Sequence, residues 1–199
     1  MKHALAVIFT LGLSATALAQ NNTSLPSTIQ PSVVTGSSQI PTYTTTVTAF
    51  ANTAASDILC LTGSDSKIVK VTGLCISAEA DSAGIIDATV ILRSALNTGG
   101  GITAVPIVKF DQLNPTPTAK AYSFTSAPTY GTAIGTIRTY KYLLEGTNQA
   151  GRTCAGTTNF PRNWGQPIVL RGATQQVCIH STALGSGGNW SLAIDHTEE

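Results

Sequence analysis

The stretch DATVILRSALNTGGGITAVPIV, Asp87–Val108, decides the fold. Its first seven residues alternate between two faces. Ala88, Val90 and Leu92 lie on the apolar face, and an acidic, a hydroxyl and a basic side chain lie on the other. A period of two residues is typical of a strand with one buried face, whereas an amphipathic helix repeats its apolar residues every three or four positions. The sequence therefore predicts a half-buried β-strand here.

Three consecutive glycines, Gly99–Gly101, follow this strand and raise the question of a phosphate-binding loop. A P-loop requires the pattern G-x-x-x-x-G-K-[ST] leading into a helix, and a dinucleotide-binding loop also opens a helix. Here no lysine follows the glycines, and Pro106 interrupts the next segment. We therefore predict a turn between strands in which the glycines adopt positive φ, and no nucleotide cofactor.

The rest of the chain repeats the pattern of short apolar-polar segments separated by turn residues. The further strand candidates are 57–62, 67–77, 104–110, 122–125, 132–144, 166–172, 174–180 and 190–196. No window shows the sustained apolar stripe of a helix. The spacing of these segments predicts an all-β protein, specifically an antiparallel β-sandwich or jelly roll.

The beginning of the chain has the features of a secretory signal peptide. Lys2 supplies a short basic region, Ala4–Leu13 is apolar, and small residues end at Ala19 in an A-x-A pattern. We expect cleavage after Ala19 and a secreted or periplasmic protein. The apolar part is shorter than the roughly 20 residues that a membrane-spanning helix needs, and no later segment is long enough, so the mature chain is predicted to have no membrane span.

These features divide the chain into three parts. Residues 1–19 are the expected signal peptide, residues 20–55 a Ser/Thr/Pro-rich arm without charged side chains, and residues 56–199 the β-sandwich domain. Within the arm, Thr42–Phe50 is rich in β-branched and aromatic residues and is a further strand candidate. The remainder of the arm is expected to extend toward a neighbouring molecule or surface.

Four cysteines follow the expected cleavage site: Cys60, Cys75, Cys154 and Cys178. An even number in an exported chain predicts disulfides. Three pairings exist, and we slightly favour Cys60–Cys75 with Cys154–Cys178 because these close short loops. Ligand spacings such as C-x2-C are absent and Cys178-x-His180 is the nearest approach, so no metal site is predicted.

The charge of the mature chain is close to zero, since removal of Lys2 from 11 basic residues leaves ten against ten acidic ones. This balance offers no electrostatic footprint for nucleic acid or anionic lipid. Charged residues are only 11% of the chain, against roughly 25% in an ordinary domain. A weakly charged surface protects poorly against association, so we expect a homo-oligomer such as a trimer.

Catalytic patterns are missing from the sequence, and we predict no catalytic residue and no cofactor. Only two histidines follow the signal peptide, and no G-x-S-x-G motif accompanies them. An unrecognised hydrolase site around His180, Asp195 and His196 is a minor alternative. Aromatic residues suggest a different one. A carbohydrate-binding module would use exposed rings as stacking platforms, and the candidates are Tyr130, Tyr140, Tyr142 and Trp164.

Several motifs in fixed order resemble a family of small jelly-roll proteins from tailed-phage structural modules and their bacterial relatives. The family has a K-x-V-x-V strand, an R-S strand end before a Gly-rich loop, a P-T-x-G-T-x-x-G-T-I-R segment and a P-I-V-L-R-G strand. In this chain they are Lys67–Val71, Arg93-Ser94, Pro128–Arg138 and Pro167–Gly172, and the resemblance covers about residues 57–199. It implies a jelly-roll fold and a tendency to assemble, and it implies no catalytic residue.

Together these observations predict an exported, non-enzymatic structural or surface-interaction protein that self-associates. Its partner would be a second copy, a cell surface or a glycan. The alternative function is the carbohydrate-binding module.

Overall fold

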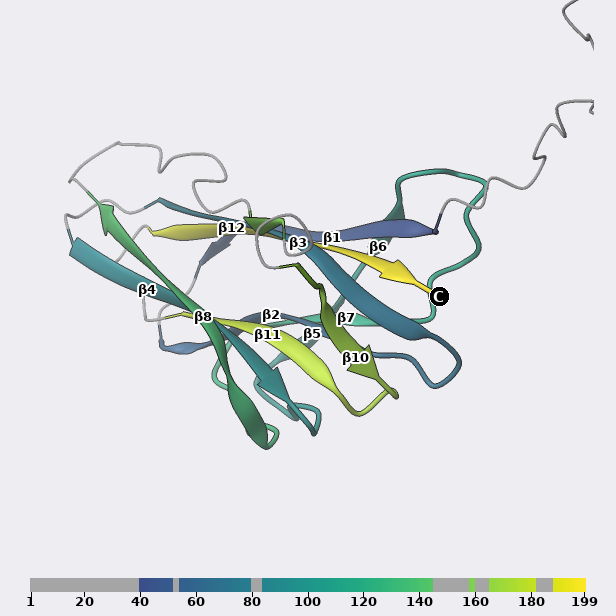
Figure 1. Cartoon of the computed structure of the whole chain (residues 1–199). Helices are drawn as coiled ribbons and strands as arrows, with labels where there is room; N and C mark the ends of the chain where they lie inside the picture. Colours follow the sequence, from purple (N-terminus) through teal and green to yellow (C-terminus); the bar gives the residue numbers. More distant parts are fainter. Residues whose placement is uncertain (1–39, 52–53, 80–83, 145–157, 160–164, 182–187) are drawn as a thin grey trace, which may run out of the picture. The chain divides into compact units, whose positions relative to one another are not determined.

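The computed structural model describes residues 40–51, 54–79, 84–144, 158–159, 165–181 and 188–199 (Figure 1). Within this part of the chain the residues form two six-stranded sheets, and every strand pairing is antiparallel. The same residues include no helix, hence none that could cross a membrane. The prediction of an all-β antiparallel sandwich is confirmed.

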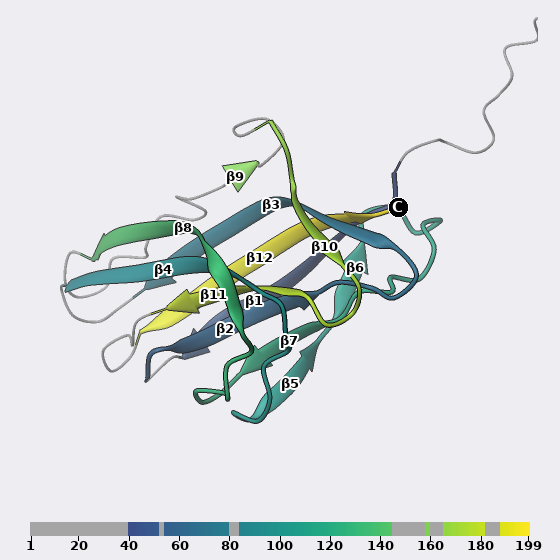
Figure 2. The same ribbon diagram turned by 60° about the horizontal axis from the view of Figure 1, so that its bottom comes forward.

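The first sheet, called sheet A here, is built around the C-terminal strand. Its order is β10 (Ile168–Arg171), β3 (Ile68–Glu79), β12 (Asn189–Glu198), β1 (Thr42–Ala51) and β6 (Ile107–Lys109), and β9 (Thr158–Asn159) also pairs with β3. Figure 2 shows β12 lying between β3 and β1.

The second sheet, sheet B, contains the predicted strand at the start of Asp87–Val108. Its order is β5 (Ile102–Val105), β7 (Ala121–Phe124), β2 (Ser56–Thr62), β11 (Gln176–Ser181), β4 (Gly84–Arg93) and β8 (Ala133–Leu144). Strand β4 contains the DATVILR segment and shows the expected alternation, with Ile86, Ala88 and Val90 buried.

The hydrophobic core lies between the two inner faces of these sheets. Trp190 of β12 is its largest side chain and is completely buried. Branched aliphatic residues from both sheets belong to the same core, including Ile76 of β3 and Val177 of β11. Burying such side chains contributes about 1.5–3 kcal/mol each, so period-two patterning on facing strands is sufficient to drive the sheets together.

The compact unit begins at Ile40 and not at residue 56, the predicted domain boundary. Thr42–Ala51, which was assigned to the arm, forms strand β1 and pairs with β12 on one side and β6 on the other. The strand predicted at Thr42–Phe50 is therefore confirmed, and it belongs to the sandwich. Residues 20–39 of the predicted arm and the expected signal peptide lie outside the described residues.

The segment after the three glycines differs from the single strand predicted at 104–110. Pro106 separates β5, which belongs to sheet B, from β6, which belongs to sheet A. A proline has no N–H for a strand ladder, so the chain changes sheets there. The glycines themselves behave as predicted: Gly99, Gly100 and Gly101 have φ of 69°, 69° and 62°. They form a turn between strands.

Candidate functional site

One extra residue in β2 places the polar groups of the candidate site on the outer face of sheet B, the face turned away from the core. In the pairing of β2 with β11, Ile179 lies opposite Leu59 and His180 opposite Asp57, so Ile58 has no partner. Ile58 and Leu59 both enter the core. Cys60, next to Leu59, faces outward toward Cys178. Because the bulge reverses the alternation before Leu59, Asp57 also faces outward, toward His180.

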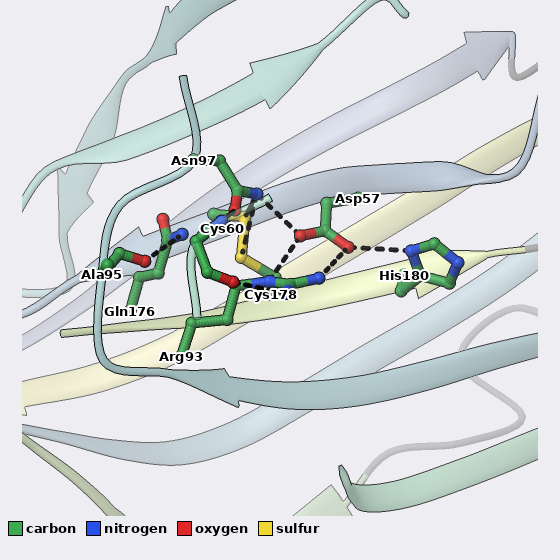
Figure 3. Close-up of a disulfide and its surroundings, with 9 residues drawn as sticks. Asp57, Cys60, Arg93, Ala95, Asn97, Gln176, Cys178 and His180 are labelled. Atoms are coloured by element: carbon green, nitrogen blue, oxygen red, sulfur yellow. Dashed lines mark hydrogen bonds and ion pairs between the residues drawn. A yellow bond between two sulfur atoms is a disulfide. The ribbon is translucent and has the colours of Figure 1, made fainter. Parts of the chain in front are cut away.

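Asp57 is completely buried and accepts hydrogen bonds from three side chains (Figure 3). Arg93, at the end of β4, binds it with two nitrogens: Nε donates to Oδ2 at 2.9 Å and Nη2 to Oδ1 at 3.1 Å. Nδ2 of Asn97 donates to Oδ2 at 2.7 Å, and Nδ1 of His180 lies 2.8 Å from Oδ1. The buried carboxylate therefore joins β2, β4, β11 and the segment that follows β4.

These partners keep Asp57 ionised. Burial alone would raise the pKa of Asp57, but the hydrogen bonds from His180, Arg93 and Asn97 outweigh it and lower the pKa below its ordinary value. An ionised carboxylate can only accept hydrogen bonds, so Nδ1 of His180 carries the proton. In a neutral ring, Nε2 is then the acceptor nitrogen, and the side chain is 28% exposed.

A second segment, around Tyr130 and Gly131, covers this cluster. Nη1 of Arg93 donates to the carbonyl of Gly131 at 2.9 Å, and the N–H of Gly131 donates to Oδ1 of Asn97 at 2.8 Å. The Arg93 guanidinium lies 4.9 Å from the centre of the Tyr130 ring, on one of its faces. The ring also meets His180 edge-on, with centroids 5.8 Å apart. Tyr130 is thus held in place by the Asp57 cluster.

A disulfide joins Cys60 of β2 to Cys178 of β11 beneath this cluster. The two cysteines are direct cross-strand partners, 118 residues apart in the sequence. This corrects the favoured pairing of Cys60 with Cys75 and of Cys154 with Cys178, which followed loop length and ignored strand register. Cys75 is also disulfide-bonded, and Cys154 lies outside the described residues.

Asp57 and the two sulfur atoms of this disulfide are close enough together to resemble a metal-ligand group. The sulfurs are bonded to each other, however, and only a thiolate is a good metal ligand. In this oxidised form the cluster has a carboxylate already occupied by Arg93, Asn97 and His180 and no cysteine ligand to offer a metal.

The four predicted stacking aromatics separate into different environments. Tyr130 is 42% exposed. Tyr140 and Tyr142 of β8 face inward and pack against the core, and the Tyr142 hydroxyl donates across the sandwich to the carbonyl of Ile76 at 3.2 Å. Burial raises the pKa of Tyr142 to about 12. These two tyrosines are not exposed platforms, and Trp164 lies outside the described residues.

The minor hydrolase alternative is not assembled by the fold. His180 lies on sheet B and is bound to Asp57, whereas Asp195 and His196 belong to β12 of sheet A. The His196 ring is completely buried and stacks on Tyr43 at 5.3 Å. Asp195 and His196 therefore do not join the Asp57–His180 pair.

The chain matches no known family model, and no curated protein or solved structure matches it either. Functional inference therefore depends on the geometry above.

Sequence reasoning missed Asp57, Arg93 and Asn97 as members of one site. Arg93 was noted only as part of the R-S strand end, and Asp57 only as the start of a strand. The one local signal was the order Asp57-Ile58-Leu59, in which a charged residue precedes two adjacent apolar residues and so breaks the period-two pattern.

Proposed function

We propose that this protein is an exported, non-enzymatic structural protein that self-associates through the outer strand pair β4–β8. The observation that carries this proposal is the cross-strand pair of Ile85 and Leu143, which are 70% and 69% exposed. Two large apolar side chains placed side by side on one sheet face do not stabilise a protein by burial while that face is in contact only with water.

The position of β8 supports the same proposal. It is the last strand of sheet B, it is 12 residues long, and among the described residues it pairs only with β4. An edge strand of this length presents unpaired backbone groups that another strand can bind. Ile134 and Ile137 add exposed apolar surface along the same strand. A second copy of the chain would cover these side chains and extend the ladder.

Export is supported by the Cys60–Cys178 disulfide, because such bonds persist in oxidising compartments. The low charge of the chain favours association, because a weakly charged surface protects poorly against it.

Sedimentation velocity of the oxidised mature chain, over a range of micromolar concentrations, tests the proposal. We expect a concentration-dependent oligomer that Ile85→Lys and Leu143→Lys convert to monomer, since each places a charge in the contact. Leu113→Lys is the matched control: Leu113 is 92% exposed and lies in the loop after β6, so its substitution should leave the oligomer intact.

A chain that stays monomeric throughout this range would refute self-association. An oligomer that survives both β4–β8 substitutions would refute the assigned surface.

A further inference from the structure

Tyr130 has the arrangement of a stacking platform. The guanidinium of Arg93 lies over one ring face, His180 meets the ring edge-on, and the residue as a whole is still 42% exposed. Its hydroxyl donates to the carbonyl of Ala55 at 3.3 Å. A ring fixed at its face and at its hydroxyl loses little conformational freedom when a ligand stacks on it.

Hydrogen-bonding groups continue from this ring across the outer face of sheet B. The strand registers place His180 of β11 next to Thr89 of β4, and Thr89 next to Thr139 of β8. The two threonine hydroxyls are 3.4 Å apart. His180, Thr89 and Thr139 therefore form one row of an imidazole and two hydroxyls, and two strand spacings make this row about 10 Å long.

The charges around this row cancel. Asp57 is matched by Arg93, and in the neighbouring cross-strand pair Nζ of Lys141 lies 2.9 Å from Oδ1 of Asp87. These two pairs leave no net positive charge to select a phosphate or sulfate and no net negative charge to select a cation. The available chemistry is an aromatic face beside groups that both donate and accept hydrogen bonds.

We propose that Tyr130 and the His180–Thr89–Thr139 row form a binding site for an uncharged oligosaccharide. The apolar C–H face of a sugar ring stacks on Tyr130, and its hydroxyls bond to Nε2 of His180 and to the threonine hydroxyls. The row is longer than a single sugar ring, so a short chain of sugars fits it better than a monosaccharide. The site uses other side chains than the Ile85–Leu143 contact proposed for self-association, although both proposals involve β4 and β8.

The test is a glycan array that carries neutral oligosaccharides alongside their sulfated and phosphorylated counterparts, probed with the oxidised mature chain. Neutral glycans found there are then titrated in solution against variants. Tyr130→Ala should weaken binding tenfold or more, and Tyr130→Phe, which keeps the ring, should retain most of it. Phe110→Ala is the matched control, because Phe110 is 64% exposed and lies in sheet A's loop after β6.

Three results would overturn the proposal: an array without any neutral ligand, binding confined to the charged glycans, or equal affinity of Tyr130→Ala and the parent chain. A thermal unfolding scan of each variant shows that loss of binding is not loss of fold. Sedimentation of Tyr130→Ala separates this site from self-association, since the oligomer should persist when sugar binding is lost.

Discussion

Acidification should remove a defined part of the protein's stability through Glu198. Its side chain is completely buried and accepts hydrogen bonds from the backbone N–H groups of Thr118 and Ala119 at 2.9–3.0 Å and from the Thr118 hydroxyl at 2.7 Å. Burial alone would raise the pKa of Glu198, but its partners lower the pKa to about 2. The causes of this lowering are His196, whose Nε2 lies 3.8 Å from Oε1, and the hydrogen bonds from the 118–119 segment.

The sign follows from comparing the folded and unfolded chains. The pKa of Glu198 in the folded chain, about 2, lies below the ordinary value of 4.5 that the unfolded chain has. The ionised side chain therefore stabilises the fold fully above pH 4.5, and this contribution disappears as the pH falls from 4.5 to 2. At about 1.4 kcal/mol per pH unit, the gap corresponds to about 3 kcal/mol.

Urea unfolding of the oxidised mature chain between pH 7 and pH 2 measures this contribution, with Glu198→Gln as the comparison. A glutamine cannot ionise, so the backbone N–H groups and the hydroxyl of the 118–119 segment face an uncharged amide group. The variant should be less stable at pH 7, and the difference from the parent should narrow by about 3 kcal/mol between pH 5 and pH 2. Glu199→Gln, at the partly exposed neighbouring residue, is the control, and its difference in stability from the parent should change little over the same pH range.

Parallel stability curves for the parent chain and Glu198→Gln would refute the reasoning. They would mean that the hydrogen bonds from the 118–119 segment do not depend on the charge of Glu198.

Three further predictions concern the Asp57 cluster. Asp57→Asn leaves the buried Arg93 guanidinium without its counter-charge and should cost about 3–5 kcal/mol in urea unfolding; an unchanged midpoint would contradict this. Replacing both Cys60 and Cys178 by alanine opens a connection of 118 residues and should cost up to about 4.7 kcal/mol, measured in the same assay. Peptide mapping without reduction should recover Cys60 linked to Cys178, and a Cys60–Cys75 peptide would show that the strand register is wrong.

The fold could be predicted from the sequence because the residue pattern of each strand indicates which of its side chains are buried. In β12, Trp190, Leu192 and Ile194 recur at every second position and are all buried. Period-two patterning requires no knowledge of the partner strand, so it located most strands correctly. The strand prediction was less complete at 104–110, where Pro106 divides the predicted strand between the two sheets.

The site was not accessible in the same way, because its members meet only through register. Cys60 and Cys178 are partners because β2 lies beside β11, and no loop-length argument contains that fact. Tyr130 and Tyr142 look alike in the sequence. One lies in the segment that covers Arg93, whereas the other points from β8 into the sandwich. The segment to which a tyrosine belongs, and the sheet face to which it points, decide whether its ring is exposed. The residue type does not.

The bulge at Ile58 connects the stability of the fold to the candidate site. In an unbulged strand, Asp57 would share a face with Leu59 and enter the core, where a carboxylate without partners is strongly unfavourable. The extra residue gives the core two adjacent apolar side chains and moves the carboxylate to the outer face. There Arg93 neutralises the carboxylate, and both Arg93 and Asn97 donate hydrogen bonds to it. The same two side chains also bind the segment of Tyr130. The contacts that satisfy the buried charge of Asp57 therefore also hold the Tyr130 ring in place. A substitution at Tyr130 should change binding with only a small effect on stability, whereas one at Asp57 should change binding and stability together.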